Sequence, residues 1–245
     1  MSTSIPQRRA LVTGGSGDLG GAICRQLAAQ GRHVIVHANR NIARADDVVA
    51  AIVADGGSAE AVAFDVADAQ ASAVALASLL EGGPIQIVVN NAGIHDDAPM
   101  AGMKAEQWHR VIDVSLHGFF NVTQPLLLPM ARTRWGRIVS VSSVAAVLGN
   151  RGQTNYAAAK AALHGASKSL SREMASRGIA VNVVAPGVIE SEMVGESFAP
   201  EVIKQLVPAG RVGKPDEVAA LVAFLCSESA GYINGQVIGI NGGMG

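Results

Sequence analysis

Seven short apolar runs, rich in valine and isoleucine, recur along the chain with longer segments between them. The runs are ALVT (10–13), HVIVH (33–37), AVAFD (61–65), IQIVVN (85–90), RIVSVSS (137–143), AVNVVAP (180–186) and QVIGI (236–240). Their hydrophobic residues are continuous rather than alternating, which is typical of strands buried on both faces. The sequence therefore predicts seven buried β-strands.

The segments between the runs have a composition that suits helices. They cover residues 19–30, 42–54, 68–81, 104–132, 153–176 and 215–228. Repeated strand–helix–strand units predict a parallel sheet with right-handed crossovers and helices on both faces. We therefore expect an α/β fold, a single doubly wound Rossmann domain over residues 1–245 with a parallel seven-stranded sheet. The long irregular stretch at about 187–212 is predicted to be a mobile lid.

Composition and charge narrow the class of protein. The 245 residues are 49% hydrophobic and 16% charged, enough for a sizeable core. A net charge of -1 gives no global reason to bind nucleic acid or an anionic membrane. Cys24 and Cys226 lie far apart in apolar helical contexts, so we expect two buried thiols, without a disulfide framework or metal site. The N-terminus lacks the hydrophobic region of a signal peptide, and no apolar run approaches the roughly 20 residues that span a bilayer. We expect a cytoplasmic protein.

A glycine cluster, LVTGGSGDLGGAI, follows the first predicted strand. Ligands of doubly wound folds bind beyond the carboxyl ends of strands, where glycines let backbone N–H groups approach a pyrophosphate. Counted from Gly15, the cluster reads G-x-G-x-x-G through Gly17 and Gly20. Counted from Gly14, it is close to T-G-x-x-x-G-x-G, with Asp18 at the middle glycine. The cluster alone leaves two classes of dinucleotide-binding enzyme open.

Candidate acid–base residues occur near the fifth run. Tyr156 and Lys160 are four residues apart on a predicted helix, so they project from one face, and Ser143 ends the strand upstream. Tyrosine becomes a useful acid–base group when its pKa falls from about 10 toward 7, which requires roughly 4 kcal/mol. The Lys160 ammonium would favour the phenolate, and Ser143 could hydrogen-bond a substrate oxygen. All three residues fit a ligand site at the strand ends.

These motifs resemble the short-chain dehydrogenase/reductase superfamily and, within it, the 3-oxoacyl-[acyl-carrier-protein] reductases. The resemblance runs from about Arg9 to Gly243 through LVTGGS, FDVAD, NNAG, RIVSVSS, NYAAAK, VNVVAPGVIE, GRVGKPDEVA and INGG. It implies NADPH-dependent reduction of a 3-oxoacyl thioester on acyl carrier protein, in fatty acid biosynthesis, by a homotetramer. In the implied mechanism Ser143 positions and polarises the carbonyl, and Tyr156 protonates it as hydride arrives. Lys160 binds the nicotinamide ribose and lowers the pKa of Tyr156.

The second run, VIVHANRN, bears on cofactor choice. NAD-preferring members end this strand with an acidic residue, which is absent here, and Arg40 is placed to meet a 2'-phosphate, so NADPH is expected. A solvated surface arginine is the alternative. The resemblance assigns the cofactor contacts to Gly14, Ser16, Asp18, Leu19 and Gly20 in the glycine loop, Asn39 and Arg40 at the ribose, Asp65 and Val66 at the adenine, Asn91, Ala92 and Gly93 at the adenosine ribose, Tyr156 and Lys160, and Ile189 at the nicotinamide carboxamide.

Two residues depart from the pattern of the resembling family. Asp18 stands in the glycine loop, where we interpret it as a helix cap; the alternative is that its charge weakens NADPH binding. Ser115, in VIDVSLHGFF, occupies the position of an asparagine that supports a water relay to the lysine. A serine hydroxyl has a shorter reach and one fewer donor, so we expect a relay through an extra water or a modest loss of rate.

Arg134 and Arg177 match positions that contact the acidic carrier protein in the resembling reductases, with Arg137 and Trp135 nearby in sequence. Solvated surface arginines are the alternative. Two other functions stay open: reduction of acetoacetyl-CoA or another small ketone, and NADPH sensing without turnover. Small residues over 153–176 would allow close helix approach, and the resemblance implies a dimer interface there.

Overall fold

A computed structural model describes residues 7–190 and 200–245. Its centre is a parallel seven-stranded sheet in the order β3-β2-β1-β4-β5-β6-β7. The strands are β1 (Arg9–Val12), β2 (His33–Ala38), β3 (Ser58–Ala63), β4 (Ile87–Asn90), β5 (Gly136–Val141), β6 (Ile179–Pro186) and β7 (Val237–Ile240). The strand order reverses between β1 and β4, the place where a doubly wound sheet binds its ligand. The predicted fold class is confirmed.

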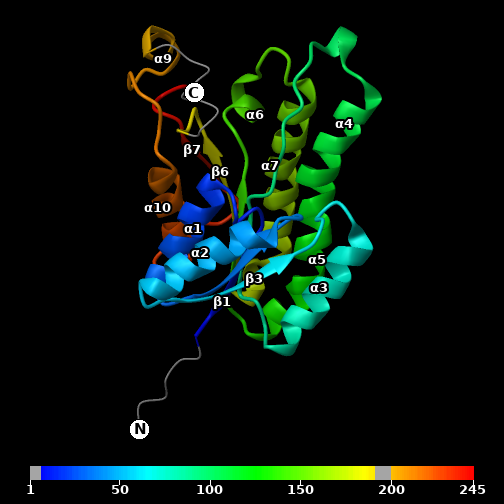
Figure 1. Cartoon of the computed structure of the whole chain (residues 1–245), viewed down its shortest axis with the longest axis vertical. Helices are drawn as coiled ribbons and strands as arrows, with labels where there is room; N and C mark the ends of the chain where they lie inside the picture. Colours follow the sequence, from blue (N-terminus) through cyan, green and yellow to red (C-terminus); the bar gives the residue numbers. More distant parts are fainter. Residues whose placement is uncertain (1–6, 191–199) are drawn as a thin grey trace.

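Helices cover both faces of the sheet (Figure 1). One layer contains α1 (Asp18–Ala29), α2 (Ile42–Ala54) and α10 (Pro215–Leu225), and the other contains α3 (Ala69–Glu81), α4 (Ala105–Ile112), α5 (Gly118–Arg132) and α7 (Thr154–Met174). Two shorter helices, α6 (Ala145–Leu148) and α9 (Pro200–Leu206), lie at the end of the molecule toward which β5 and β6 run. Short 3-10 turns occur at η1 (Met100–Gly102) and η3 (Ala175–Arg177), and η2 (Asp113–His117) is a π-helical segment.

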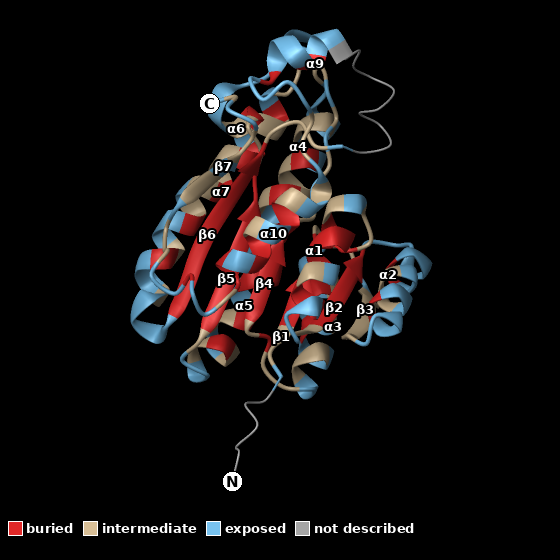
Figure 2. Cartoon of the chain, turned by 90° about the vertical axis from the view of Figure 1, so that its left-hand side faces the viewer, coloured by how far each residue is buried: buried red, intermediate tan, exposed pale blue. Residues whose placement is uncertain are grey.

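Two hydrophobic cores lie on opposite faces of the sheet. Val34 and Val36 of β2 pack in the core that contains Leu27 of α1, whereas Ile35 packs in the core that contains Leu126 of α5. Successive strand residues point to opposite faces, so an element buried on both sides needs an unbroken apolar run. Figure 2 shows this burial along the central strands β4, β5 and β6.

The prediction of full burial is wrong for the two outer strands. Most residues of β3 and β7 are partly exposed, and β3 begins at Ser58 rather than at residue 61. Each has a neighbouring strand on one side only, so less of its surface is covered. Cys24 and Cys226 are both free and buried, as expected.

Two other expectations need correction. The single helix predicted over 104–132 is interrupted by the π-helical turn η2, which inserts an extra residue into the helical repeat. The stretch at 187–212 was expected to be irregular, but it contains helix α9. Residues 191–199 of the predicted lid lie outside the described residues.

Candidate functional site

The glycine loop after β1 closes tightly on itself. Gly14 has a φ of 64°, and a Cβ there would lie 3.0 Å from the Asn91 side chain. A Cβ on Gly20 would lie 2.1 Å from the carbonyl oxygen of Gly14, whereas one on Gly17 would make only an ordinary contact at 3.6 Å. Glycine is therefore required at 14 and 20, and not at 17. This steric pattern favours the motif counted from Gly14 over G-x-G-x-x-G.

Asp18 is the first residue of α1 and does not cap it. The N-cap position is Gly17, and no side chain caps the helix. The predicted cap is wrong because the helix begins at residue 18, which places the carboxylate within the first turn. There it interacts favourably with the helix dipole, while the uncapped N–H groups remain able to bind an anion. Ser16 is half-buried in the same loop.

Ser143, Tyr156 and Lys160 line one cleft of about 210 Å³, together with Leu19. Ser143 follows the end of β5, and the other two residues lie one turn apart on α7. The neighbouring Ser142 hydroxyl donates to the Lys160 carbonyl at 3.0 Å, which holds α7 against the end of β5. The fold thus brings together the three residues that sequence analysis selected.

The pKa of Tyr156 is raised, in contrast to the expected decrease. Burial is the main cause and the charge of Asp97 adds to it, while a hydrogen bond with Ser143 acts in the opposite direction. Lys160 does not compensate, because its ammonium donates to the Val141 carbonyl at 2.9 Å and lies 5.7 Å from the Tyr156 ring centroid. The phenol therefore keeps its proton at neutral pH, the state needed to donate one.

Lys160 is almost completely enclosed. Burial lowers the pKa of its ammonium from 10.5 to about 8. A Cβ added to Gly93 would lie 2.8 Å from Lys160 Nζ and 3.7 Å from Ser115 Oγ. The two polar groups therefore lie against the same glycine.

Ser115 lies in the π-helical turn η2 and is buried. Its hydroxyl has no hydrogen-bond partner in the described part of the chain. Buried polar groups are normally hydrogen-bonded, and π-helical turns are frequent at functional sites. The hydroxyl beside Lys160 is therefore free to join a polar network in this cleft.

Candidate cofactor contacts also follow β2 and β3. Asn39 and Arg40 come after β2 and are exposed, and Arg40 makes no ion pair among residues 7–190 and 200–245. Asp65 accepts a hydrogen bond from the Ala67 N–H at 2.9 Å, and Val66 is buried. Because β2 and β3 pair in parallel, these residues lie at neighbouring strand ends.

Asn91 and Ala92, after β4, tie this strand to the glycine loop. The Asn91 side-chain amide donates to the carbonyls of Thr13 at 2.9 Å and Gly14 at 3.2 Å. The Thr13 hydroxyl accepts from the N–H groups of Asn91 and Ala92, both at 3.0 Å. These bonds show a supporting role, and the expected contact with a ribose stays a prediction.

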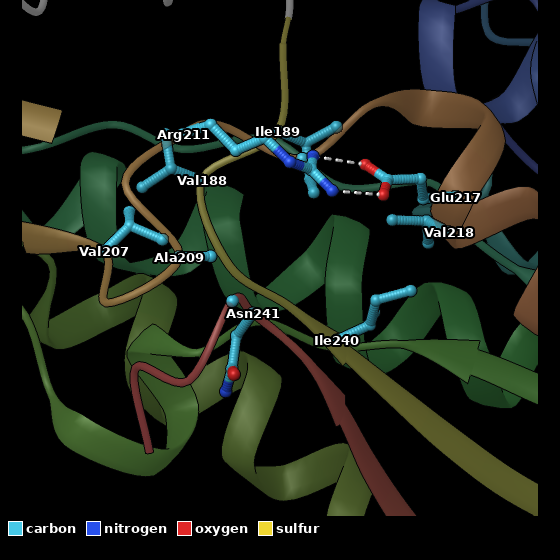
Figure 3. Close-up of a pocket in the computed structure, with 11 residues that line it drawn as sticks. Val188, Ile189, Val207, Ala209, Arg211, Glu217, Val218, Ile240 and Asn241 are labelled. Carbon is cyan, nitrogen blue, oxygen red and sulfur yellow. Dashed lines mark hydrogen bonds and ion pairs between the residues drawn. The ribbon is translucent and has the colours of Figure 1, made fainter. Parts of the chain in front are cut away.

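Ile189 lines both the cleft and a second pocket of about 70 Å³, and Figure 3 shows the residues of this second pocket. It forms a parallel bridge with Gly213. Nearby, Arg211 holds Glu217 through two hydrogen bonds of 2.7 and 2.8 Å, and Glu217 also accepts from the Lys214 N–H at 2.8 Å. This ion pair anchors the end of the 187–212 stretch to the start of α10.

The two candidate docking arginines lie away from the cleft. Arg134 precedes β5 and Arg177 precedes β6, so both lie at the amino ends of strands whose carboxyl ends carry the site. Six residues of β5 at about 3.3 Å each separate the two ends by roughly 20 Å. Both arginines are exposed, and Arg134 donates to the Ser176 carbonyl at 3.4 Å.

Arg137 and Trp135 are engaged elsewhere. Arg137 is buried and donates to the Ser227 carbonyl at 3.1 Å. Its guanidinium lies 4.5 Å from the centroid of the Trp135 ring, and that of Arg8 lies 3.5 Å from it. Trp135 therefore packs against Arg8 and Arg137 rather than beside Arg134 and Arg177.

Two histidines at the site were not predicted from the sequence. His37, in β2, is buried and hydrogen-bonded to the glycine loop, and its signal was a polar residue inside an apolar run. His95 lines the cleft, with its ring centroid 6.4 Å from that of Tyr156 and Nδ1 3.6 Å from Asp97. The spacing of residues in the sequence gave no sign that His95 lies near Tyr156 and Asp97.

Within residues 7–190 and 200–245, no group of three or more histidine, cysteine, aspartate or glutamate residues could hold a metal ion. None of the helices in that part of the chain has both the length and the hydropathy to cross a membrane.

A glycine loop before an open helix N-terminus, with a polar cleft at the switch point of a doubly wound sheet, is typical of dinucleotide-dependent enzymes. The family model described as short chain dehydrogenase matches residues 8–202. The chain is 42% identical to the 3-oxoacyl-[acyl-carrier-protein] reductase FabG of Aggregatibacter actinomycetemcomitans, over 96% of this chain and 98% of the relative. It is also 42% identical to the 3-oxoacyl-[acyl-carrier-protein] reductase of Synechocystis sp. (99% and 98%) and to Nodulation protein G of Azospirillum brasilense (98% and 99%).

The chain belongs to the short-chain dehydrogenase family and is an oxidoreductase. Members of this family use a nicotinamide cofactor. The site fits such a group on two observations of its own. Glycine is sterically required at 14 and 20 beside an uncapped helix N-terminus, and the buried Ser115 hydroxyl is without a partner in the described part of the chain.

Proposed function

We propose that this protein reduces a 3-oxoacyl thioester carried by acyl carrier protein to the 3-hydroxyacyl form, with NADPH as reductant, in fatty acid biosynthesis. The main support for this proposal is the cleft in which Ser143, Tyr156 and Lys160 meet beside the glycine loop. Two relatives that match nearly the whole chain are named as reductases of this substrate class.

In the proposed reaction each residue has a distinct role. A nicotinamide held beside Lys160 would provide the hydride for the carbonyl carbon. Ser143 would hydrogen-bond the carbonyl oxygen, and Tyr156, which is protonated at neutral pH, would transfer its phenolic proton to it. Lys160 would bind the nicotinamide ribose, and the Ser115 hydroxyl would return a proton through water.

The remaining proposed contacts hold the cofactor. The glycine loop from Gly14 to Gly20 would receive the pyrophosphate at the start of α1. Arg40, exposed after a strand that ends without an acid, would bind the 2'-phosphate. Asp65 and Val66 would contact the adenine. The contacts of Ser16, Asp18, Leu19, Asn39, Asn91, Ala92, Gly93 and Ile189 stay proposals of the same kind.

The proposed carrier docking involves two copies of the chain. Arg134 and Arg177 are exposed but lie at the end of the sheet opposite the cleft. We propose that a carrier held there serves the site of a second copy. Phe120 and Leu128 of α5 are exposed by 62% and 72%, which supports a covered interface on this layer and the homotetramer that we propose. The cytoplasmic location stays a prediction.

A small polar ketone is the second candidate substrate. His95 gives the cleft a polar wall near the Tyr156 ring, and its Nδ1 lies 3.6 Å from Asp97, to which the Gln153 amide donates at 2.8 Å. Such a wall offers hydrogen bonds that an acyl chain does not use. This observation favours a compact ketone or alcohol over a long acyl substrate.

One experiment separates the two substrates. NADPH oxidation is measured with acetoacetyl-carrier protein, acetoacetyl-CoA and a panel of small ketones. We expect the highest kcat/KM with the carrier-bound substrate, and a loss of about tenfold or more when Arg134→Glu and Arg177→Glu are combined. Arg25→Glu, on the exposed face of α1, is the control for charge reversal. Faster turnover of a ketone, unaffected by both arginines, would contradict the carrier proposal.

A further inference from the structure

His37 is a buried imidazole whose two nitrogens are both hydrogen-bonded. Its Nδ1 accepts from the Gly14 N–H at 3.0 Å, and its Nε2 lies 2.9 Å from the Phe64 carbonyl oxygen. A backbone N–H can only donate and a carbonyl can only accept. His37 is therefore neutral, with its proton on Nε2.

These two bonds connect separate parts of the nucleotide site. Gly14 begins the glycine loop, and Phe64 immediately precedes Asp65, the proposed adenine contact. His37 itself lies three residues before Arg40. The Phe64 ring packs edge-on against the imidazole, with centroids 4.3 Å apart. One side chain thus links the ends of β1, β2 and β3.

The hydrogen bonds that Asn91 makes to the glycine loop do not replace those that His37 makes. Asn91 binds the carbonyls of Thr13 and Gly14 from the β4 side, whereas His37 binds the Gly14 N–H from the β2 side. The left-handed backbone of Gly14 is thereby held on both sides. Burial lowers the pKa of His37 to about 4, which is consistent with the neutral form.

We infer that His37 is a positioning residue for the cofactor: it fixes the glycine loop relative to the adenine-binding segment and thereby sets the affinity for the dinucleotide. This inference rests on the proposed use of a nicotinamide cofactor. It assigns no contact between His37 and the cofactor. Because His37 is inferred to affect cofactor binding, its substitution should change the Kd and KM for NADPH rather than kcat at saturating NADPH.

Substitution of His37 by asparagine or by glutamine tests the two hydrogen bonds separately. The side-chain oxygen of His37→Asn can occupy the place of Nδ1 and accept from Gly14, but its amide is too short to reach Phe64. His37→Gln reaches toward Phe64 and lacks an acceptor at the Nδ1 position. His37→Leu removes both bonds. Ile35→Val, a core substitution on the same strand, controls for loss of stability.

The test measures the Kd for NADPH by fluorescence titration and the Tm of each variant. We expect a rise in Kd of tenfold or more for His37→Leu, smaller rises for His37→Asn and His37→Gln, which each keep one of the two bonds, and a rise of less than threefold for Ile35→Val. Equal Kd values in all variants would overturn the inference, as would affinity losses that simply follow Tm and include Ile35→Val. If the wild-type protein binds neither NADPH nor NADH, the proposed function fails instead.

Discussion

Gly20 packs so closely on Gly14 that one added methyl group at Gly20 would lie 2.1 Å from the Gly14 carbonyl oxygen. The Gly14 oxygen is a backbone atom and a Cβ is fixed to the backbone that carries it, so no flexible side chain can move aside. The contact brings the first turn of α1 against the loop that leaves β1, and it leaves the helix N-terminus open to a phosphate.

The first prediction concerns this contact. Gly20→Ala should destabilise the fold by about 1–3 kcal/mol or more, as overpacking does, which lowers Tm by several degrees at about 2–4 °C per kcal/mol. Gly17→Ala is the matched control, since its Cβ has an ordinary 3.6 Å contact. Thermal unfolding followed by circular dichroism measures both variants. Equal Tm values for the two would contradict the assignment of the motif.

The second prediction concerns cofactor choice. Arg40→Glu should reduce kcat/KM for NADPH by about 10- to 100-fold, because it removes hydrogen bonds to a phosphate worth about 1.5–3 kcal/mol. Activity with NADH should be unchanged or higher. Arg44→Glu makes the same charge change in the first turn of α2 and should leave the ratio of NADPH to NADH activity near that of the wild type. An equal loss of kcat/KM with NADPH and with NADH would show that Arg40 does not bind the 2'-phosphate.

The third prediction concerns the unpartnered hydroxyl of Ser115. Ser115→Asn restores an amide at this position, and activity should stay within about tenfold of the wild type, roughly 1.4 kcal/mol of barrier. Steady-state NADPH oxidation measures this change, with Tm recorded to detect strain in the π-helical turn. A rise of several hundredfold would identify the natural serine as a defect in catalysis.

The fourth prediction is a pH dependence of stability. The pKa of Lys160 falls from 10.5 in the unfolded chain to about 8 in the fold. Below pH 8 both states carry the proton, and burial of the charge costs roughly 3 kcal/mol at 1.36 kcal/mol per pH unit. Between pH 8 and 10.5 the unfolded chain binds more protons, so the free energy of unfolding rises with pH.

Lys160→Met should remove this penalty together with the activity. At pH 7 its Tm should exceed that of the wild type by several degrees, less a contribution from the lost bond to the Val141 carbonyl. The gap should narrow as the pH rises from 8 to 10.5. A variant that is less stable than the wild type at pH 7 would show that the buried ammonium is not a cost to the fold.

Periodicity predicted the seven strands, six helical segments and the parallel topology because burial on two faces requires continuous apolar runs. The partial exposure of β3 and β7 depends on strand order, which local patterns do not contain. The π-helical turn at Ser115 and the start of α1 at Asp18 were missed for a different reason. One-residue shifts in a helix are set by packing, here of Gly118 against Val66 and of Gly20 against Gly14.

The candidate site was predictable where residues follow strand ends or share a helix face, as Ser143, Tyr156 and Lys160 do. The direction of the Tyr156 pKa shift could not be predicted from the sequence. It depends on burial and on Asp97, whose position in the fold does not follow from residue spacing. The positions of His37 and His95 at the site could not be predicted for the same reason. Their partners come from distant segments that only the folded sheet brings together.

The central claim is that Tyr156 donates the proton in an NADPH-dependent reduction. The most direct test compares the wild type with Tyr156→Phe in NADPH oxidation by acetoacetyl-carrier protein, with NADPH binding measured in parallel. The account predicts a loss of about 10²–10⁴ in kcat, the range of general acid catalysis, with the Kd for NADPH within threefold of the wild type. A Tyr156→Phe variant that keeps more than a tenth of the wild-type kcat would contradict it.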